Sequence, residues 1–180
     1  MKTCIALFRG INVGGKNALP MKELIAILED LGARKVKTYI QSGNAVFVGK
    51  EKDAPRLAKT IREEIKKRRR FEPYVLLLGL DEIETAIRQN PFPEAESNPT
   101  TLHAGFLAAT PERPDIKTLE SLKSDSERFR LIGRVFYLYA PDGVGRSKLA
   151  AQAERLLGVP MTDRNWRTVC AIWKMAQELK

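Results

Sequence analysis

The sequence is poor in the side chains that most often bind metals or form cross-links. Among 180 residues it has two cysteines, Cys4 and Cys170, and a single histidine, His103. Both cysteines lie in apolar stretches and the chain has the features of a cytosolic protein, so we expect buried thiols rather than a disulfide. Protein zinc sites draw most of their ligands from Cys and His. The sequence therefore predicts no bound metal, and none of its motifs indicates a cofactor.

Long hydrophobic runs are also missing. The apolar stretch near the N-terminus, in MKTCIALFRG, is interrupted by Arg9. A signal peptide needs a longer apolar segment with a cleavage site, and a transmembrane helix needs about 20 apolar residues. We therefore expect no membrane association and a cytoplasmic location. The sequence makes no prediction about the oligomeric state.

Positive charge is in excess, since 31 Lys and Arg residues face 22 Asp and Glu residues, for a net charge of +9. Such a surplus attracts phosphorylated metabolites and nucleic acids, but it is also common on ordinary solvated surfaces. The run KKRRR, residues 66–70, allows the same two interpretations. Cations are favoured at the negative end of a helix, so a solvated helix end is preferred over a contact with nucleic acid.

The apolar periodicity predicts two copies of one order of elements, strand–helix–strand–strand–helix–strand followed by a helix. In the first half the expected elements are a strand at 3–11, a helix between Pro20 and Gly32, a hairpin of 35–40 and 44–48, a helix at 53–70, a strand at 74–80 and a helix ending near 90. In the second half they are a strand at 100–110, a helix at 114–123, a hairpin turning near Gly133, a helix at 145–158, a short strand at 160–162 and a final helix capped by Thr162 or Asp163.

This order is the ferredoxin-like pattern, so the predicted fold class is α+β, a duplicated ferredoxin-like fold with antiparallel sheets. The predicted domains are residues 1–90 and 100–180. The proline-rich stretch 91–99 is the predicted linker between them.

The segment RGINVGGKN, residues 9–17, joins the first strand to the first helix. A glycine-rich loop at this position can present backbone N–H groups to a phosphate, with Arg9 and Lys16 adding positive potential. The segment matches neither of the common phosphate-binding glycine motifs. Gly14 and Gly15 are equally typical of a tight turn, so both interpretations stay open.

Three further stretches carry polar groups that could bind an anion: QSGN at 41–44, GRSK at 145–148 and RNW at 164–166. QSGN also has an ordinary structural interpretation as a hairpin turn, and RNW follows a predicted helix cap at Thr162 or Asp163. GRSK places Ser147 and Lys148 at the start of a helix and resembles half of a P-loop. We expect RGINVGG to share a concave surface with GRSK or RNW. The candidate ligand-binding residues are Arg9, Asn12, Gly14, Gly15, Ser42, Asn44, Ser147, Lys148, Arg164 and Asn165.

Two classes of function follow from these residues. The first is a binding module for a phosphorylated small molecule or a nucleic acid. The second is a small enzyme acting on a phosphorylated substrate, with Lys148, Arg9 or Arg164 stabilising charge and Asp142 or Asp163 acting as acid or base. His103 has no evident serine, cysteine or carboxylate partner in the sequence, and no nucleophile with a partner base is recognisable, so binding is favoured over catalysis.

Several of these motifs together resemble a known family. LFRGINVGGKN, TYIQSGNAVF, GRSKL and RNW closely resemble the bacterial family called domain of unknown function 1697. The resemblance implies a duplicated ferredoxin-like fold and supplies no activity. This chain departs from the family with Ala45 in place of a larger branched residue and Asp163 in place of a second threonine. The matching motif residues are Arg9, Gly10, Asn12, Gly14, Gly15, Tyr39, Ser42, Gly43, Asn44, Ser147, Lys148, Arg164, Asn165 and Trp166.

Overall fold

The structure, a computed structural model, describes residues 2–50 and 53–180. Its internal contacts divide the chain into two compact units. The first unit contains the residues up to Thr85 together with Cys170–Lys180, and the second contains Ala86–Val169. This grouping places the C-terminal segment with the first unit, whereas the sequence-based division at 1–90 and 100–180 assigned it to the second.

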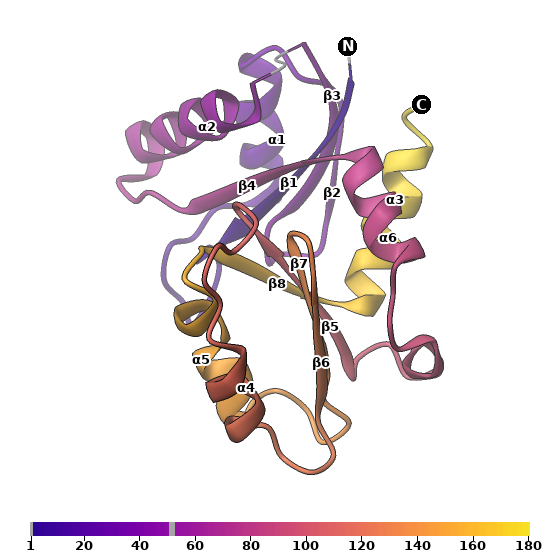
Figure 1. Cartoon of the computed structure of the whole chain (residues 1–180). Coiled ribbons are helices and arrows are strands. Elements are labelled where there is room, and N and C mark those ends of the chain that lie inside the picture. The colour runs from indigo at the N-terminus through magenta and orange to yellow at the C-terminus, as the bar shows by residue number, and fades with distance from the viewer. Residues whose placement is uncertain (1, 51–52) are drawn as a thin grey trace. The chain divides into compact units, whose positions relative to one another are not determined.

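The first unit contains one four-stranded antiparallel sheet (Figure 1). The strand order is β2-β3-β1-β4, the order of a ferredoxin-like fold. Every pair of neighbouring strands is antiparallel, as the sequence analysis predicted. The elements are β1 (Lys2–Arg9), α1 (Met21–Asp30), β2 (Arg34–Tyr39), β3 (Asn44–Gly49), α2 (Ala54–Arg69), β4 (Tyr74–Gly79) and α3 (Leu80–Arg88).

Local signals explain where the first two helices begin and end. α1 is followed by Gly32 at φ +88°, and the N–H of Ala33 donates to the carbonyl oxygen of Leu28 at 3.0 Å. A left-handed glycine with such a bond is a common helix terminator. At the start of α2 the Asp53 carboxylate accepts from the backbone N–H of Arg56 at 3.1 Å. This side-chain cap satisfies one of the donors that a helix start leaves free.

The core of the first unit lies on one face of its sheet. Because side chains alternate along a strand, every second residue of β1, β3 and β4 points to this face, and α1 and α2 both pack against it. The buried members are Ala6, Phe8, Ala45, Phe47, Val75 and Leu77 from the strands and Leu24, Ile27, Leu28, Ile61 and Ile65 from the helices.

The basic run at the end of α2 forms ion pairs. Four of its five residues pair with Asp or Glu, and Arg68 and Arg69 connect α2 to α1. The pairs are Lys66–Glu72, Lys67–Glu64, Arg68–Glu64, Arg68–Asp30 and Arg69–Glu23. Exposed pairs of this kind contribute ~0.2–1 kcal/mol each. Most of the charge in this run is thus paired within the first unit, and the preference for a solvated helix end over a nucleic-acid contact stays a prediction.

The second unit repeats the arrangement. Its sheet has the order β6-β7-β5-β8, again entirely antiparallel, and α4 and α5 lie side by side on one face. Leu107, Phe136 and Leu138 from the strands pack there against Leu119 and Leu149 from the helices. The elements are η1 (Pro93–Ser97), β5 (Leu102–Leu107), α4 (Ile116–Leu122), β6 (Arg128–Ile132), β7 (Val135–Tyr139), α5 (Lys148–Leu157), β8 (Met161–Asn165) and α6 (Trp166–Gln177), the last of which runs into the first unit.

The predicted start of the final helix is wrong. Thr162 and Asp163 resemble helix caps in the sequence, but both lie inside β8, where pairing with β5 holds them extended. The strand continues to Asn165, whose Oδ1 accepts from the N–H of Thr168 at 3.0 Å. Asn165 is therefore the cap of α6, and the strand is longer than the predicted residues 160–162.

Two properties of the described chain bear on its chemistry. Cys4 and Cys170 are both partly buried, and burial raises the pKa of the Cys4 thiol above its usual value. No helix in the described ranges combines the length and the apolar character needed to cross a bilayer.

Candidate functional site

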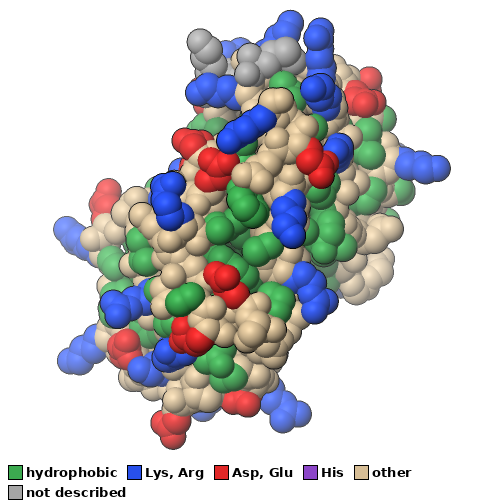
Figure 2. Space-filling view, turned by 90° about the vertical axis from the view of Figure 1, so that its right-hand side faces the viewer, with side chains coloured by type: hydrophobic (Ala, Val, Ile, Leu, Met, Phe, Trp, Pro, Cys, Tyr) green, Lys and Arg blue, Asp and Glu red, His purple; other side chains and the backbone are tan. Residues whose placement is uncertain are grey.

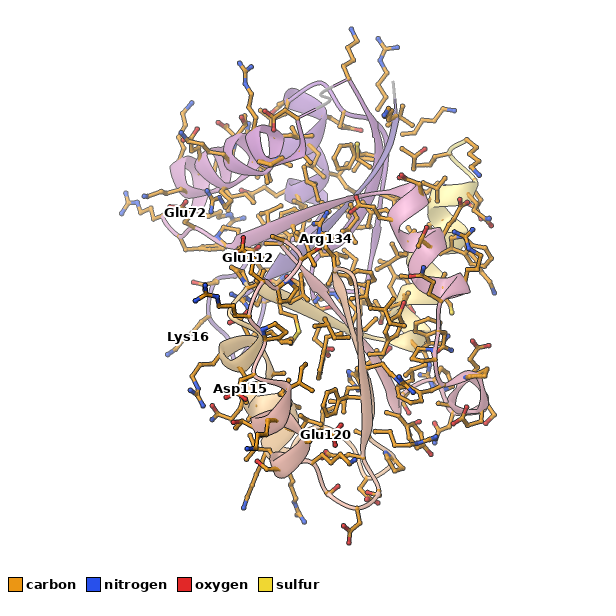
Figure 3. The ribbon with its side chains drawn as sticks, viewed as in Figure 1. Lys16, Glu72, Glu112, Asp115, Glu120 and Arg134 are labelled. Carbon is orange, nitrogen blue, oxygen red and sulfur yellow. The ribbon has the colours of Figure 1, made fainter. Side chains whose placement is uncertain are left out.

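The segment RGINVGGKN forms a small hairpin. Val13 and Lys16 pair as an isolated bridge, and the N–H of Lys16 donates to the carbonyl oxygen of Val13 at 3.1 Å. The two residues between them, Gly14 and Gly15, have φ angles of +58° and +72°. Positive φ at both central residues defines a type I′ turn, which explains the two glycines on conformational grounds. Lys16 lies at the tip and its side chain is directed away from the sheet (Figure 3).

Asn12 ties this hairpin to the neighbouring loop QSGN. Its side-chain amide donates to the carbonyl oxygens of Leu19 at 2.8 Å and Gln41 at 2.9 Å. Its Oδ1 accepts from the N–H of Leu19 at 2.7 Å. All three bonds are internal, so the Asn12 side chain holds the two predicted loops together and both of its N–H donors are used.

The loop QSGN is held by Gly43 and Asn44. Asn44 is fully buried, and its Nδ2 donates to the carbonyl oxygen of Tyr39 at 3.0 Å and to Ser42 Oγ at 3.4 Å. Gly43 has φ +87°, and a Cβ there would lie 2.6 Å from side-chain atoms of Phe8 and Ile11. The loop therefore requires glycine at position 43, and Ser42 is the exposed member of the predicted pair.

Arg9 is exposed but in contact with an aromatic ring. Its guanidinium carbon lies 4.9 Å from the centroid of the Tyr74 ring, in the neighbouring strand β4. This is a cation–π distance. The interaction positions the Arg9 side chain beside the first residue of β4.

The predicted residues of the second unit are mostly helix caps. Ser147 Oγ accepts from the N–H of Ala150 at 2.9 Å and caps α5, with Lys148 exposed beside it. Asn165 caps α6. Arg164 donates from Nη1 to the carbonyl oxygen of Asp163 at 2.8 Å, and burial lowers the Arg164 pKa to about 10, which still leaves it charged at neutral pH.

The structure thus brings the predicted residues together in two groups. Arg9, Asn12, Gly14, Gly15, Ser42 and Asn44 belong to the first unit, and Ser147, Lys148, Arg164 and Asn165 belong to the second. In the first group Asn12 connects the two loops directly. That the two groups share one concave surface stays a prediction.

Sequence reasoning missed a partner of His103. His103 Nδ1 lies 2.7 Å from Asp163 Oδ2, so the prediction that His103 has no carboxylate partner is wrong. The two residues are far apart in sequence but lie on β5 and β8, which are neighbours in the sheet. The predicted fold could have indicated this pair, because a ferredoxin-like order places the first and last strands of a repeat side by side.

Sequence reasoning also missed a pocket in the first unit, which we call the Lys50–Arg56 pocket. It has a volume of 310 Å³ and lies where α1 and β3 end and α2 begins. It is lined by Leu28, Leu31, Gly32, Ala33, Phe47, Gly49, Lys50, Arg56, Leu57 and Thr60. None of these described lining residues is acidic. Lys50 and Arg56 escaped notice because neither belongs to a glycine-rich motif.

Charge is unequally divided between the units. The first unit has 19 Lys and Arg residues against 12 Asp and Glu residues, a net charge of +7, whereas the second has 12 against 10, or +2. On the face drawn in Figure 2, Lys and Arg side chains project one by one between acidic and hydrophobic side chains. That face carries no continuous basic stripe of the kind that follows a nucleic-acid backbone. Within residues 2–50 and 53–180, no three His, Cys, Asp or Glu side chains gather in a metal-binding group.

Comparisons with known proteins place the chain in a family. A search of curated proteins found no match. Among solved structures, the conserved bacterial protein SP0830 from Streptococcus pneumoniae is similar, with a TM-score of 0.74 and 26% sequence identity over 97% of this chain and 98% of that chain. The sequence model of the family described as "protein of unknown function (DUF1697)" matches residues 1–137, and the chain therefore belongs to this family.

Proposed function

We propose that this protein is a binding module for a small phosphorylated ligand with an apolar body, and that the Lys50–Arg56 pocket is the site. The observation that carries the proposal is the pairing of two cations with an apolar floor in one cavity. The proposal narrows the predicted class of anionic ligands to small molecules. None of the ten predicted binding residues lines this pocket.

The floor of the pocket supports an apolar body on the ligand. Phe47 and Leu28 are almost fully buried at its base, and Leu57 lies on the α2 side. A volume of 310 Å³ is at the small end of the range for small-molecule sites, about 300–1,000 Å³. An aromatic ring or short acyl chain fits this floor, and a folded polynucleotide does not.

The rim supports an anionic group. Arg56 offers a planar fork of N–H donors that suits a phosphate, and Lys50 adds a second charge. Among the described residues, neither side chain has an acidic partner, in contrast to the neutralised run at 66–70. The first N–H groups of α2 are partly used by the Asp53 cap, so recognition falls on the two side chains rather than on the helix start.

The same lining favours binding over catalysis. The described residues around the pocket include no histidine, cysteine, Asp or Glu that could move a proton or attack a substrate. Thr60 Oγ1 is engaged with the carbonyl oxygen of Arg56 in its own helix at 3.1 Å. The pocket thus offers charge and shape but no acid or base.

Titration calorimetry with phenyl phosphate as the probe tests the proposal. Arg56→Gln and Lys50→Gln should each weaken binding about tenfold, because a hydrogen bond to a charged group contributes ~1.5–3 kcal/mol and 1.4 kcal/mol is a factor of ten. Arg70→Gln is the matched control, since Arg70 is an exposed arginine beyond the other end of α2. Phenol, which lacks the charge, should bind much more weakly.

Two results would contradict this assignment. If neither pocket substitution changes the affinity for phenyl phosphate, the pocket is not the site. If Arg9→Gln removes binding while Arg56→Gln does not, the predicted loop RGINVGG binds the anion instead. Bound phenyl phosphate should also stabilise the fold by ~2.7 kcal/mol at a hundredfold excess over its dissociation constant, which thermal unfolding measures.

A further inference from the structure

A second cavity, within the second unit, has the opposite electrostatic character. We call it the Asp163 pocket. It has a volume of 280 Å³ and lies between the sheet and the start of α5. It is lined by Phe136, Leu138, Val144, Gly145, Ser147, Ala150, Ala151, Ala153, Met161 and Asp163. Among these described residues Asp163 is the one charged side chain.

The position of Asp163 follows from the alternation of β8. Met161 and Asp163 are two residues apart, so their side chains lie on the same face of the sheet. Met161 packs against the core under α4 and α5, which identifies this face. Opposite Asp163 in β5 is Gly105, whose missing side chain leaves space that Met161 occupies. Asp163 therefore lies at the edge of an apolar cavity, with its side chain 46% exposed.

His103 fixes the orientation of this carboxylate. Its Nδ1 lies 2.7 Å from Asp163 Oδ2, and the histidine itself is only 8% exposed. Because a carboxylate accepts, Nδ1 carries the hydrogen and donates it to Oδ2. In the part of the chain that the structure describes, Asp163 Oδ1 and His103 Nε2 have no further hydrogen-bond partner. One oriented carboxylate oxygen is thus available to a ligand.

The rest of the lining is apolar or already engaged. Phe136, Leu138, Val144 and Met161 supply hydrocarbon surface. Ser147 Oγ accepts the capping bond from Ala150. An anion in this space would meet the like charge of Asp163. An uncharged apolar molecule would shield the carboxylate from water without pairing it, which costs free energy.

We propose that the Asp163 pocket binds a small primary amine with an apolar body. The ammonium group donates to Asp163 Oδ1 and the apolar body lies against Phe136 and Leu138. His103 is a positioning residue, because it holds the carboxylate without contacting the ligand. The proposal is independent of the phosphate site, since it concerns another unit and a ligand of opposite charge.

The probe is 2-phenylethylamine, with 2-phenylethanol as its neutral and 3-phenylpropanoate as its anionic counterpart. A ligand of this size gains roughly 0.3 kcal/mol or more per heavy atom, so the expected dissociation constant is about 10 mM or lower and NMR titration is the suitable method. The amine should bind about tenfold more tightly than the alcohol, and the acid should not bind measurably. Backbone resonances of the pocket residues should shift with the amine.

Asp163→Asn keeps the shape of the side chain and should remove the preference for the amine without weakening the binding of the alcohol. Asp142→Asn is the matched control, because Asp142 is exposed, accepts from Ser126 Oγ at 2.7 Å and does not line the pocket. His103→Gln should reduce the preference for the amine without changing the affinity for the alcohol. If the role of His103 were purely structural, His103→Gln would lower the affinities for the amine and the alcohol equally.

If the Asp163→Asn variant does not fold, Ala151→Phe tests the pocket instead. Ala151 is an exposed helix residue on the pocket wall. A phenyl group at this position should block the entry of all three probes. The proposal is overturned if the wild type binds the alcohol as tightly as the amine. It is equally overturned if Asp163→Asn keeps the preference for the amine, or if Ala151→Phe binds it as the wild type does.

Discussion

Tyr137 offers the most direct test of how the second unit is held together. It is fully buried in β7, and its hydroxyl donates a hydrogen bond of 2.7 Å to the carbonyl oxygen of Ala86. Ala86 is among the last four residues of α3, whose carbonyl groups have no partner within the helix. The Tyr137 hydroxyl therefore satisfies an acceptor that would otherwise be buried alone.

Tyr137→Phe keeps the ring and its packing against Trp166 but removes this donor. A buried acceptor left without a partner costs ~1–3 kcal/mol. We therefore expect the free energy of unfolding to fall by that amount at neutral pH. Urea denaturation followed by tryptophan fluorescence measures the difference.

The pH dependence gives a second readout of the same residue. Burial raises the pKa of Tyr137 from 10.0 to about 12. Because the folded pKa is the higher one, the associated stability is fully present below pH 10 and is lost as the pH rises toward 12. The rise corresponds to about 2–3 kcal/mol. The wild type should therefore lose stability over this window more steeply than Tyr137→Phe, and the gap between them should close. Equal stability at neutral pH, together with equal alkaline slopes, would refute the reasoning.

Three further substitutions test the loops and the ion pairs of the first unit. Asn12→Ala removes three internal hydrogen bonds and should lower the free energy of unfolding by about 2–3 kcal/mol in urea. Gly43→Ala should cost about 3 kcal/mol, because it combines a left-handed backbone with a Cβ 2.6 Å from Ile11; an unchanged midpoint would contradict the geometry. The hydrogen bond from Arg69 lowers the pKa of Glu23, so the charged form of Glu23 stabilises the fold. Because the pair is exposed, Glu23→Gln should lower the free energy of unfolding by less than ~1 kcal/mol at neutral pH. In acid denaturation, the difference in stability between wild type and variant should vanish as the pH falls through the pKa of Glu23.

Most of the fold could be predicted because it is encoded locally. Alternating and helical apolar patterns identified both copies of the strand and helix order, and Gly32 marked the end of α1 as a left-handed terminator. Asp53 was placed at the start of the second helix and caps it. The end of β8 could not be recognised in this way. Thr162 and Asp163 are typical cap residues, and only their pairing with β5 keeps them extended.

The candidate sites were harder to predict because they depend on contacts between distant residues. The motif search selected glycines and polar side chains, and the structure assigns several of these to turns and caps, as with Gly14, Gly15 and Ser147. Of the side chains that line cavities, Lys50 stands in no motif, and Asp163 was selected as a helix cap and as a possible acid or base but not as part of a cavity. Each cavity forms where several helices and strands pack together, and a pattern along the sequence does not indicate such contacts.

The division of α6 between the two units has a consequence for how the chain is made. The segment Cys170–Lys180 belongs to the first unit, where Lys180 pairs with Glu84 at 3.1 Å and Glu178 with Lys37 at 2.7 Å. The first unit is therefore discontinuous in sequence, whereas the second is a single contiguous segment. Since chains emerge from the ribosome N-terminus first, the first unit cannot be complete until residues 170–180 have been synthesised. The unit that is synthesised later is thus the one that can be completed first.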